Sequence, residues 1–376
     1  MLPVPPPIYV TQPIMPALDD FMESLRKIWD SKFLTNVGAF HQKLEAALCA
    51  HLGVEHISLF ANGTVALMVA LQAQGIKGEV ITTPYSFVAS AEAITWNGAT
   101  PVFVDIDPVS FNLDPDLIEA AITPRTQAIM PVHCYGNPCQ MERIEAIARK
   151  HGLKVIYDAA HAFGVRQDGQ SILRHGDLAV LSFHATKVFS TIEGGAIVCR
   201  DAATKQHIDR LKNFGIADEV TVVAAGLNGK MNEVSAAFGL LQLESVDAAL
   251  AQRRAVAALY RRLLDGVTGI APMTAGEHEA NDSYFPILVG DDYPLGRDGL
   301  HQTLREAGIH ARRYFYPLIS EFPMYRDLPS ATPDKLPNAA LVARQVLCLP
   351  IYPALAQYDV ERIVSLIAVG ATRHRT

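Results

Sequence analysis

Short apolar runs alternate with amphipathic segments along the N-terminal half of the chain. The runs lie at 56–60, 80–83, 102–105, 128–132, 153–158, 178–183 and 196–200, and most are followed by a segment whose apolar positions recur at helical spacing. Short runs of this kind are typical of buried strands. Strands separated by helices indicate parallel βαβ units, so the pattern predicts an α/β fold.

Helical spacing marks most of the remaining segments. We predict helices at 16–31, 40–52, 62–73, 88–97, 115–122, 141–151, 203–214 and 232–264. Beyond the last and longest helix, the chain mixes a strand at 284–289, helices at 300–307 and 360–369, and proline-rich loops. We therefore expect a large domain over 1–264, which includes the N-terminal helices, and a smaller α+β domain over 265–376.

Composition and charge exclude several classes of protein. The chain has 376 residues, of which 49% are hydrophobic and 19% charged, enough to bury a sizeable core. A net charge of −7 without a basic run argues against nucleic acid or an anionic membrane surface as a partner. No apolar run approaches the length of a membrane span, and residues 1–16 lack a signal-peptide pattern. The five cysteines, an odd number, suit reduced core thiols, so we expect a cytoplasmic protein.

Two residue pairs are weak candidates for metal ligands. Cys134 and Cys139 flank a turn, and Asp105 and Asp107 lie where a strand ends. Neither pair has further ligands at metal-binding spacing, and the aspartates also suit a strand end and the turn at Pro108. We therefore expect no metal site.

Lys187 lies on a predicted loop between two apolar runs, after 178–183 and before a Gly-Gly pair at 194–195. An ammonium is costly to bury, and burial lowers the pKa of a lysine enough to free its amine for Schiff-base chemistry. The alternative is a solvated lysine that extends out of a turn.

Asp158 ends the predicted strand at 153–158. A carboxylate at the C-terminal end of a strand in an α/β sheet points into the crevice where such sheets bind ligands. Opposite a pyridine nitrogen, it would keep the ring of pyridoxal phosphate (PLP) protonated and therefore able to accept electrons. Alternatively, Asp158 caps a helix that begins at Ala159 and Ala160.

Asn62-Gly63-Thr64 directly follows the strand at 56–60 and opens an alanine-rich helix. The start of a helix presents unpaired N–H groups and a positive dipole end, which together can hold a phosphate. Gly63 allows close approach and Thr64 adds a hydroxyl. A helix cap without a ligand is the alternative for this motif.

Five motifs in order resemble one family. They are Asn62-Gly63-Thr64, Thr83 to Ala89 (TPYSFVA), Asp158 to His161 (DAAH), Ser182 to Lys187 (SFHATK) and Glu193 to Ala196 (EGGA). Together they resemble the DegT/DnrJ/EryC1/StrS family of sugar aminotransferases across nearly the whole chain. The resemblance implies PLP-dependent fold type I, similar to aspartate aminotransferase, with a large, mostly parallel mixed sheet domain and a smaller α+β domain.

The resemblance also implies roles for individual residues. Lys187 would carry the cofactor and Asp158 would hold its ring nitrogen. The other implied cofactor contacts are His161 near the ring hydroxyl, Phe87 stacked on the ring, and Gly63, Thr64, Ser182 and a partner subunit's Asn228 at the phosphate. Candidates for substrate binding are His184, Lys230, Arg312 and Tyr314. Lys230 stands where the family has arginine, and Ile319 where it has histidine, so contacts made by those family residues are altered here.

The activity implied is transfer of an amino group from L-glutamate to a keto-sugar nucleotide, with pyridoxamine phosphate as the intermediate form of the cofactor and with active sites at the interface of a homodimer. The chain resembles most the members that aminate C4 of dTDP-4-keto-6-deoxy-D-glucose. Amination at C3 of a 3-keto sugar is an alternative, because the sugar's orientation decides the position of attack. The family's 3-dehydratases carry histidine in place of Lys187. A non-catalytic regulatory or sugar-binding protein would be favoured by a broken Asp158 and Lys187 pair, and both residues are present.

Overall fold

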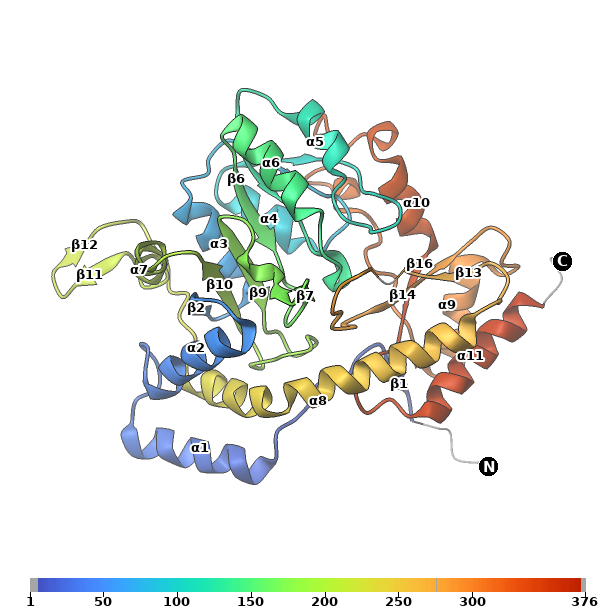
Figure 1. Cartoon of the computed structure of the whole chain (residues 1–376), viewed down its shortest axis with the longest axis horizontal. Helices are drawn as coiled ribbons and strands as arrows, with labels where there is room; N and C mark the ends of the chain where they lie inside the picture. The colour runs from blue at the N-terminus through green and yellow to red at the C-terminus, as the bar shows by residue number, and fades with distance from the viewer. Residues whose placement is uncertain (1–5, 275, 373–376) are drawn as a thin grey trace.

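The computed structural model describes residues 6–274 and 276–372 and is built around a seven-stranded sheet (Figure 1). The strand order is β2-β10-β9-β6-β5-β3-β4, and β10 runs antiparallel to both neighbours while the other neighbouring pairs are parallel. This mixed, mostly parallel sheet confirms the predicted fold class. The strands are β2 (His56–Phe60), β3 (Glu79–Thr82), β4 (Thr100–Phe103), β5 (Thr126–Met130), β6 (Lys154–Asp158), β9 (Leu178–Ser182) and β10 (Gly195–Cys199).

An α-helix lies between β2 and β3 and between each later pair of consecutive strands up to β6, as the spacing of apolar residues predicts. Residues 159–177, which join β6 to the parallel strand β9, contain no α-helix. β10 follows β9 through a loop and runs antiparallel to it. That loop carries Lys187, as expected. The helices of this part are α1 (Leu18–Ser31), α2 (Ala39–Leu52), α3 (Gly63–Ala73), α4 (Ala89–Trp96), α5 (Pro115–Ala121), α6 (Met141–His151), α7 (Ala202–Leu211) and α8 (Glu233–Leu264).

A second, three-stranded antiparallel sheet lies in the C-terminal part, in the order β13-β14-β16. Its strands are β13 (Ile270–Pro272), β14 (Phe285–Val289) and β16 (Val346–Leu349), and its helices are α9 (Gly296–Glu306), α10 (Pro337–Gln345) and α11 (Gln357–Ala371). Our sequence analysis did not identify β13, β16 or α10. The carboxylate of Asp105 accepts the Asn338 and Ala339 amides at the start of α10, so this aspartate caps a distant helix.

Short strands join parts of the chain that are far apart in sequence. β1 (Ile8–Tyr9) pairs in parallel with β15 (Ile309–His310). The hairpin of β11 (Ile216–Asp218) and β12 (Thr221–Val222) extends away from the main body (Figure 1). β7 (Arg166–Gln167) and β8 (Gln170–Ser171) form another small hairpin.

Helix α8 runs beneath both sheets and links the two parts (Figure 1). Among the described residues it is the one helix long and apolar enough to cross a membrane, which the sequence pattern had not suggested. Half of its most apolar window is buried inside the protein, as in the core helix of a soluble fold. Its last turns, from Val256 to Leu264, pack in the C-terminal core together with Ile8. A domain boundary after residue 264 remains our proposal.

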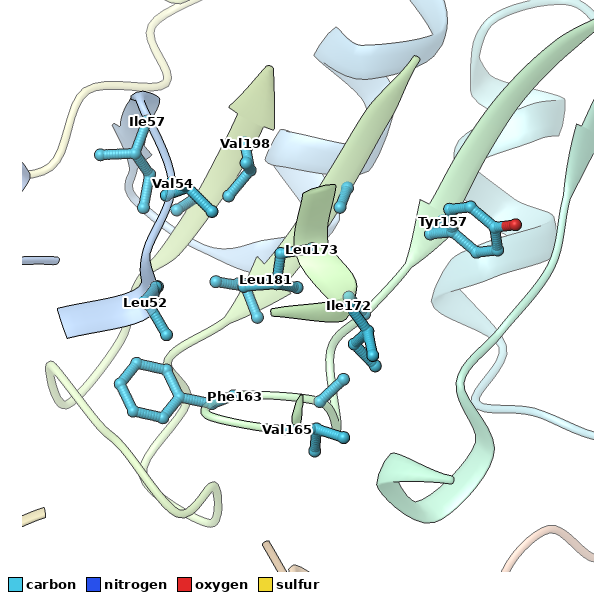
Figure 2. Packing of buried hydrophobic residues seen from close by; sticks show 14 of the residues in the cluster. Leu52, Val54, Ile57, Tyr157, Phe163, Val165, Ile172, Leu173, Leu181 and Val198 are labelled. Atoms are coloured by element: carbon cyan, nitrogen blue, oxygen red, sulfur yellow. The ribbon is translucent and has the colours of Figure 1, made fainter. Parts of the chain in front are cut away.

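The main core packs against one face of the large sheet (Figure 2). Figure 2 shows Tyr157 of β6, Leu181 of β9 and Val198 of β10 gathered with Phe163 and Leu173 from the segment between β6 and β9. All five side chains are buried. The strand residues among them are buried because the strands of a mostly parallel sheet are covered on both faces. The five cysteines are all free, as expected.

Beside this core lies a partly buried charged cluster around Glu45 of α2. Its carboxylate is 3.2 Å from His41 Nε2, 3.1 Å from Lys205 Nζ and 3.6 Å from Lys212 Nζ. Burial alone would raise the pKa of Glu45, but the hydrogen bond with His41 and the charges of the two lysines outweigh it and lower the pKa to about 2. The ionised carboxylate therefore stabilises the folded state.

We predict that Glu45→Gln lowers the free energy of unfolding at pH 7 by on the order of 3 kcal/mol. The folded pKa lies below the unfolded value, so this contribution is present above about pH 4.5 and is lost as the pH falls toward 2. Urea unfolding at several pH values measures it. The same substitution at the exposed Glu244 of α8 is the control and should change little. Equal losses for Glu45→Gln at pH 7 and pH 2 would contradict the electrostatic account.

Candidate active site

A cavity of about 540 Å³ opens at the carboxyl ends of the parallel strands. Asp158 is the last residue of β6, Ser182 is the last of β9, and Phe87 lies in the loop after β3. All three line the cavity, together with the start of α3 and residues from β1 and the C-terminal part. The structure thus brings together most of the predicted site residues: Gly63, Thr64, Phe87, Asp158, His161, Ser182, His184, Lys187, Arg312 and Tyr314.

Asp158 is buried, and both of its carboxylate oxygens accept hydrogen bonds. The hydroxyl of Ser90 donates to Oδ2 at 2.7 Å, and the amide of Ala160 donates to Oδ1 at 3.1 Å. Burial raises the pKa of Asp158, while these two hydrogen bonds and the charge of Lys187 oppose that shift. The residues after Asp158 form a turn and no helix begins there, so the helix-cap alternative is wrong.

Lys187 extends into the cavity from the loop between β9 and β10. Its Nζ lies 6.0 Å from the centre of the Tyr284 ring. Burial lowers the pKa of Lys187 to about 8, and the negative charge of Asp158 opposes the shift. An amine with this pKa is unprotonated in a substantial fraction of molecules near neutral pH, as a nucleophile or general base requires. Lys187 is half-buried and lines the cavity, so it does not extend freely out of the turn into solvent.

His161 is buried between two aromatic rings. Its ring stacks on Phe315 at 5.8 Å between centroids and meets Tyr284 edge-on at 4.9 Å. Nδ1 accepts the amide hydrogen of Tyr135 at 3.2 Å, which leaves the proton on Nε2. Burial and the nearby charge of Lys187 lower the pKa of His161 well below its usual value, so the ring is neutral and Nε2 carries a proton that it can donate to a ligand.

The start of helix α3 forms one end of the cavity. The side chain of Asn62 accepts the Val65 amide. The amides of Gly63 and Thr64 precede the first helical hydrogen bond, and both residues line the cavity, so these amides are available to a ligand. A Cβ at Gly63 would lie 3.0 Å from the Cβ of Ser182. A Cβ at Gly195 would lie 2.7 Å from the Gly63 nitrogen. Glycine at both positions therefore allows the end of β9 and the start of β10 to approach these amides.

Residues from the C-terminal part form the opposite wall. The guanidinium of Arg312 lies over the Tyr314 ring, 5.2 Å from its centre. The hydroxyls of Tyr85 and Tyr135 both donate to the main-chain oxygen of Tyr314 and so hold this wall against the large sheet. Ile319, which we expected to stand where the family has histidine, is buried, and its amide donates to the Pro84 oxygen at 3.0 Å. It does not line the cavity.

Two predicted site residues, Asn228 and Lys230, lie outside this cavity in the single chain. Asn228 is exposed and forms a bridge with Asn213. The Nζ of Lys230 donates to the Asn213 side chain at 2.6 Å and lies over the ring of Phe214. Neither residue lines the cavity. A role for Asn228 in a partner subunit's site stays a prediction.

Our sequence analysis missed several cavity residues. Tyr9 belongs to β1, and Thr11 lies two residues beyond it. Tyr284 precedes β14, and Glu193 lies 3.6 Å from His184 Nε2. Tyr9 and Tyr284 are distant in sequence from every motif, so no local pattern marks them. Ser90, the partner of Asp158, could have been suspected, because it is a polar residue on the buried side of a short apolar helix.

Comparison with known proteins identifies the fold's family. The family model described as the DegT/DnrJ/EryC1/StrS aminotransferase family matches residues 17–368. The chain belongs to this family. It is therefore an aminotransferase, as the sequence motifs suggested.

Individual relatives of this aminotransferase match over almost their full length. The dTDP-4-amino-4,6-dideoxy-D-glucose transaminase of Shigella dysenteriae is 58% identical over 362 residues, which are 96% of this chain and 98% of the relative. The protein of the same name from Escherichia coli is 54% identical, covering 96% and 98%. Among solved structures, DesI in the presence of its TDP-sugar product superposes with a TM-score of 0.93, at 36% identity, covering 99% of this chain and 94% of that one.

The donor set of the aminotransferase's cavity fits PLP, the cofactor that the family implies. Unpaired amides and hydroxyls at the α3 end suit a phosphate, and the carboxylate of Asp158 suits a protonated ring nitrogen. Lys187 supplies an amine of lowered pKa for the aldehyde. Phe87 is 60% exposed although it lies at the cavity, so its ring is free to stack on a ligand.

We predict that Lys187 of the cofactor-free enzyme reacts with an amine-directed acylating reagent at a rate that rises with pH and levels off above about pH 8. Only the unprotonated amine reacts, and burial favours that form. An ordinary lysine would gain reactivity up to about pH 10.4. Mass spectrometry of the peptide that contains Lys187 measures the rate, and peptides with exposed lysines serve as internal controls. A rate that still rises tenfold per pH unit above pH 9 would show that the amine is not desolvated.

Proposed function

We propose that this enzyme transfers the amino group of L-glutamate to dTDP-4-keto-6-deoxy-D-glucose, giving dTDP-4-amino-4,6-dideoxy-D-glucose and 2-oxoglutarate. The supporting observation is identity of 58% and 54%, over 96% of the chain, to two transaminases named for that product. An intact cavity with Lys187 and Asp158 supports catalysis over a regulatory role. We infer that the enzyme works in the cytoplasm.

PLP, when bound, supplies an aldehyde that carries the amino group and a ring that accepts electrons. We propose that Lys187 Nζ holds the cofactor covalently and, once released, moves a proton to and from the substrate carbon. Asp158 would keep the ring nitrogen protonated, and Nε2 of His161 would donate to the ring hydroxyl. Phe87 would hold the ring's face. Phosphate contacts would come from Gly63, Thr64 and Ser182 and from a partner subunit's Asn228.

Charge in the cavity favours two anionic substrates in turn. Arg312 contributes the one guanidinium among the residues that line the cavity in the described part of the chain. A guanidinium binds carboxylate and diphosphate groups in the same two-pronged way. We propose that Arg312 and Tyr314 bind first the carboxylate of glutamate and then the diphosphate of the sugar nucleotide, with His184 nearby. Lys230 would reach a substrate only from a partner subunit.

The substrate proposal is tested by incubating the enzyme with L-glutamate and separately prepared 4-keto and 3-keto dTDP-sugars. We expect turnover of the 4-keto sugar, with the new C–N bond at C4 and 2-oxoglutarate formed in equal amount. NMR of the isolated product locates the bond. Nitrogen at C3, or preference for a GDP or UDP sugar, would refute the substrate while leaving the aminotransferase activity standing.

The proposed homodimer is tested by mixing two inactive variants, Lys187→Ala and Asn228→Asp. A heterodimer of these chains has one site with both defects and one site with neither. Random exchange makes half of the dimers heterodimers, so we expect recovery of about a quarter of wild-type activity.

The control mixes Lys187→Ala with a chain that carries both substitutions, since every site then lacks the lysine. It should stay inactive. If native mass spectrometry shows subunit exchange and the test mixture also stays inactive, Asn228 does not serve the neighbouring site.

A further inference from the structure

The environment of Asp158 extends beyond the cavity through two serines. Ser90 lies in the first turn of α4, is fully buried, and places Oγ 2.7 Å from Oδ2 of Asp158. Ser86 is also buried and places its Oγ 3.2 Å from that of Ser90. The two hydroxyls and the carboxylate therefore form a chain of hydrogen bonds that leads from the cavity wall to Asp158.

The direction of this chain follows from the number of protons. A hydroxyl has one proton to donate, and an ionised carboxylate can only accept. Ser90 therefore donates to Asp158, although the main-chain oxygen of Phe87 is also within 3.3 Å of its Oγ. The oxygen of Ser90 is then left to accept, which makes Ser86 the donor between the two serines.

These contacts fix the plane of the carboxylate. The Ala160 amide binds Oδ1 and the Ser90 hydroxyl binds Oδ2, so both oxygens are held from the protein side. Asp158 nevertheless lines the cavity, where a further lone pair is available to a ligand. A carboxylate held at two points cannot turn freely, and a ligand that binds it loses less conformational entropy.

We propose that Ser90 is a positioning residue that holds the Asp158 carboxylate in the orientation needed to bind the ring N–H of PLP. The proposal rests on the proposed function, in which Asp158 faces that nitrogen. Ser86 supports this orientation by donating a hydrogen bond to the oxygen of Ser90. Ser86 and Ser90 lie just before and just after Phe87 in sequence. The segment that presents Phe87 to the ring thus also holds the carboxylate that binds the ring nitrogen.

The test compares two ligands of the cofactor-free enzyme. Pyridoxamine phosphate has the ring nitrogen, and its 1-deaza analogue has carbon in that place but is otherwise the same shape. Quenching of intrinsic fluorescence gives the Kd of each ligand. The Kd of the 1-deaza analogue divided by the Kd of pyridoxamine phosphate measures the contribution of the ring nitrogen. Changes in packing or phosphate binding affect both values equally and cancel in this ratio.

We expect Ser90→Ala to lower this ratio about tenfold or more, because a hydrogen bond to a charged group is among the stronger ones in proteins. Ser86→Ala should lower it by a smaller factor. Thr95→Ala is the matched control: Thr95 lies on the same helix, its hydroxyl donates to the Ala91 oxygen, and it does not line the cavity. Its ratio should equal that of the wild type.

Ser90→Thr keeps the hydroxyl while changing the packing, and it should keep the wild-type ratio even if both affinities fall. A wild-type ratio in Ser90→Ala would overturn the proposal, as would an equal loss of affinity for both ligands. If wild-type enzyme does not distinguish the ligands, or binds neither, the proposed PLP site itself fails. The two failures are therefore distinguishable.

As an independent spectroscopic readout, 15N NMR of enzyme loaded with ring-15N PLP reports protonation at the nitrogen. Ser90→Ala should move this resonance toward that of an unprotonated pyridine, whereas Thr95→Ala should leave it in place. An unchanged resonance in Ser90→Ala would count against the proposal.

Discussion

The parallel direction of β3, β6 and β9 is the constraint on which this structure depends. Strands that run the same way end at the same edge of the sheet, so their last residues lie close together in space although they are far apart in sequence. Asp158, Ser182 and the loop of Ser86 and Phe87 come together for this reason. The reversed strand β10 completes the arrangement, because the loop that turns the chain back carries Lys187 across the same edge.

This constraint explains how much the sequence could predict. The pattern of apolar runs located each strand of the large sheet to within a few residues, and a motif that follows a strand directly was placed correctly in the cavity. Lys187 and Asp158 could be identified as candidates because each is an ionisable side chain next to an apolar strand, where a charge does not help folding. Gly63 could be recognised because a helix begins there.

The wall formed by the C-terminal part could not be predicted in the same way. β16 has only four residues and lies between a helix and prolines. A run this short does not show the alternation that would mark it as a strand. Tyr284 and Phe315 contact His161 only because the C-terminal part packs against the carboxyl edge of the large sheet, and no spacing along the chain encodes that contact. The pairing of Ser90 with Asp158 likewise joins a helix and a strand that are 68 residues apart in sequence. The position of Asn228 in an assembly depends on a second chain.

The pairing of β1 with β15 has a consequence for how the protein is made. Tyr9 lines the cavity and its ring stacks on His310, so a residue near the beginning of the chain and one in its last fifth form adjoining surfaces. On a ribosome, the first of these leaves the exit tunnel long before the second is synthesised. The large sheet can form during translation, whereas the cavity closes only when synthesis is almost complete. A nascent chain would therefore expose the edge that bears Lys187 to solvent from the time this edge forms until the residues of the C-terminal wall have been synthesised.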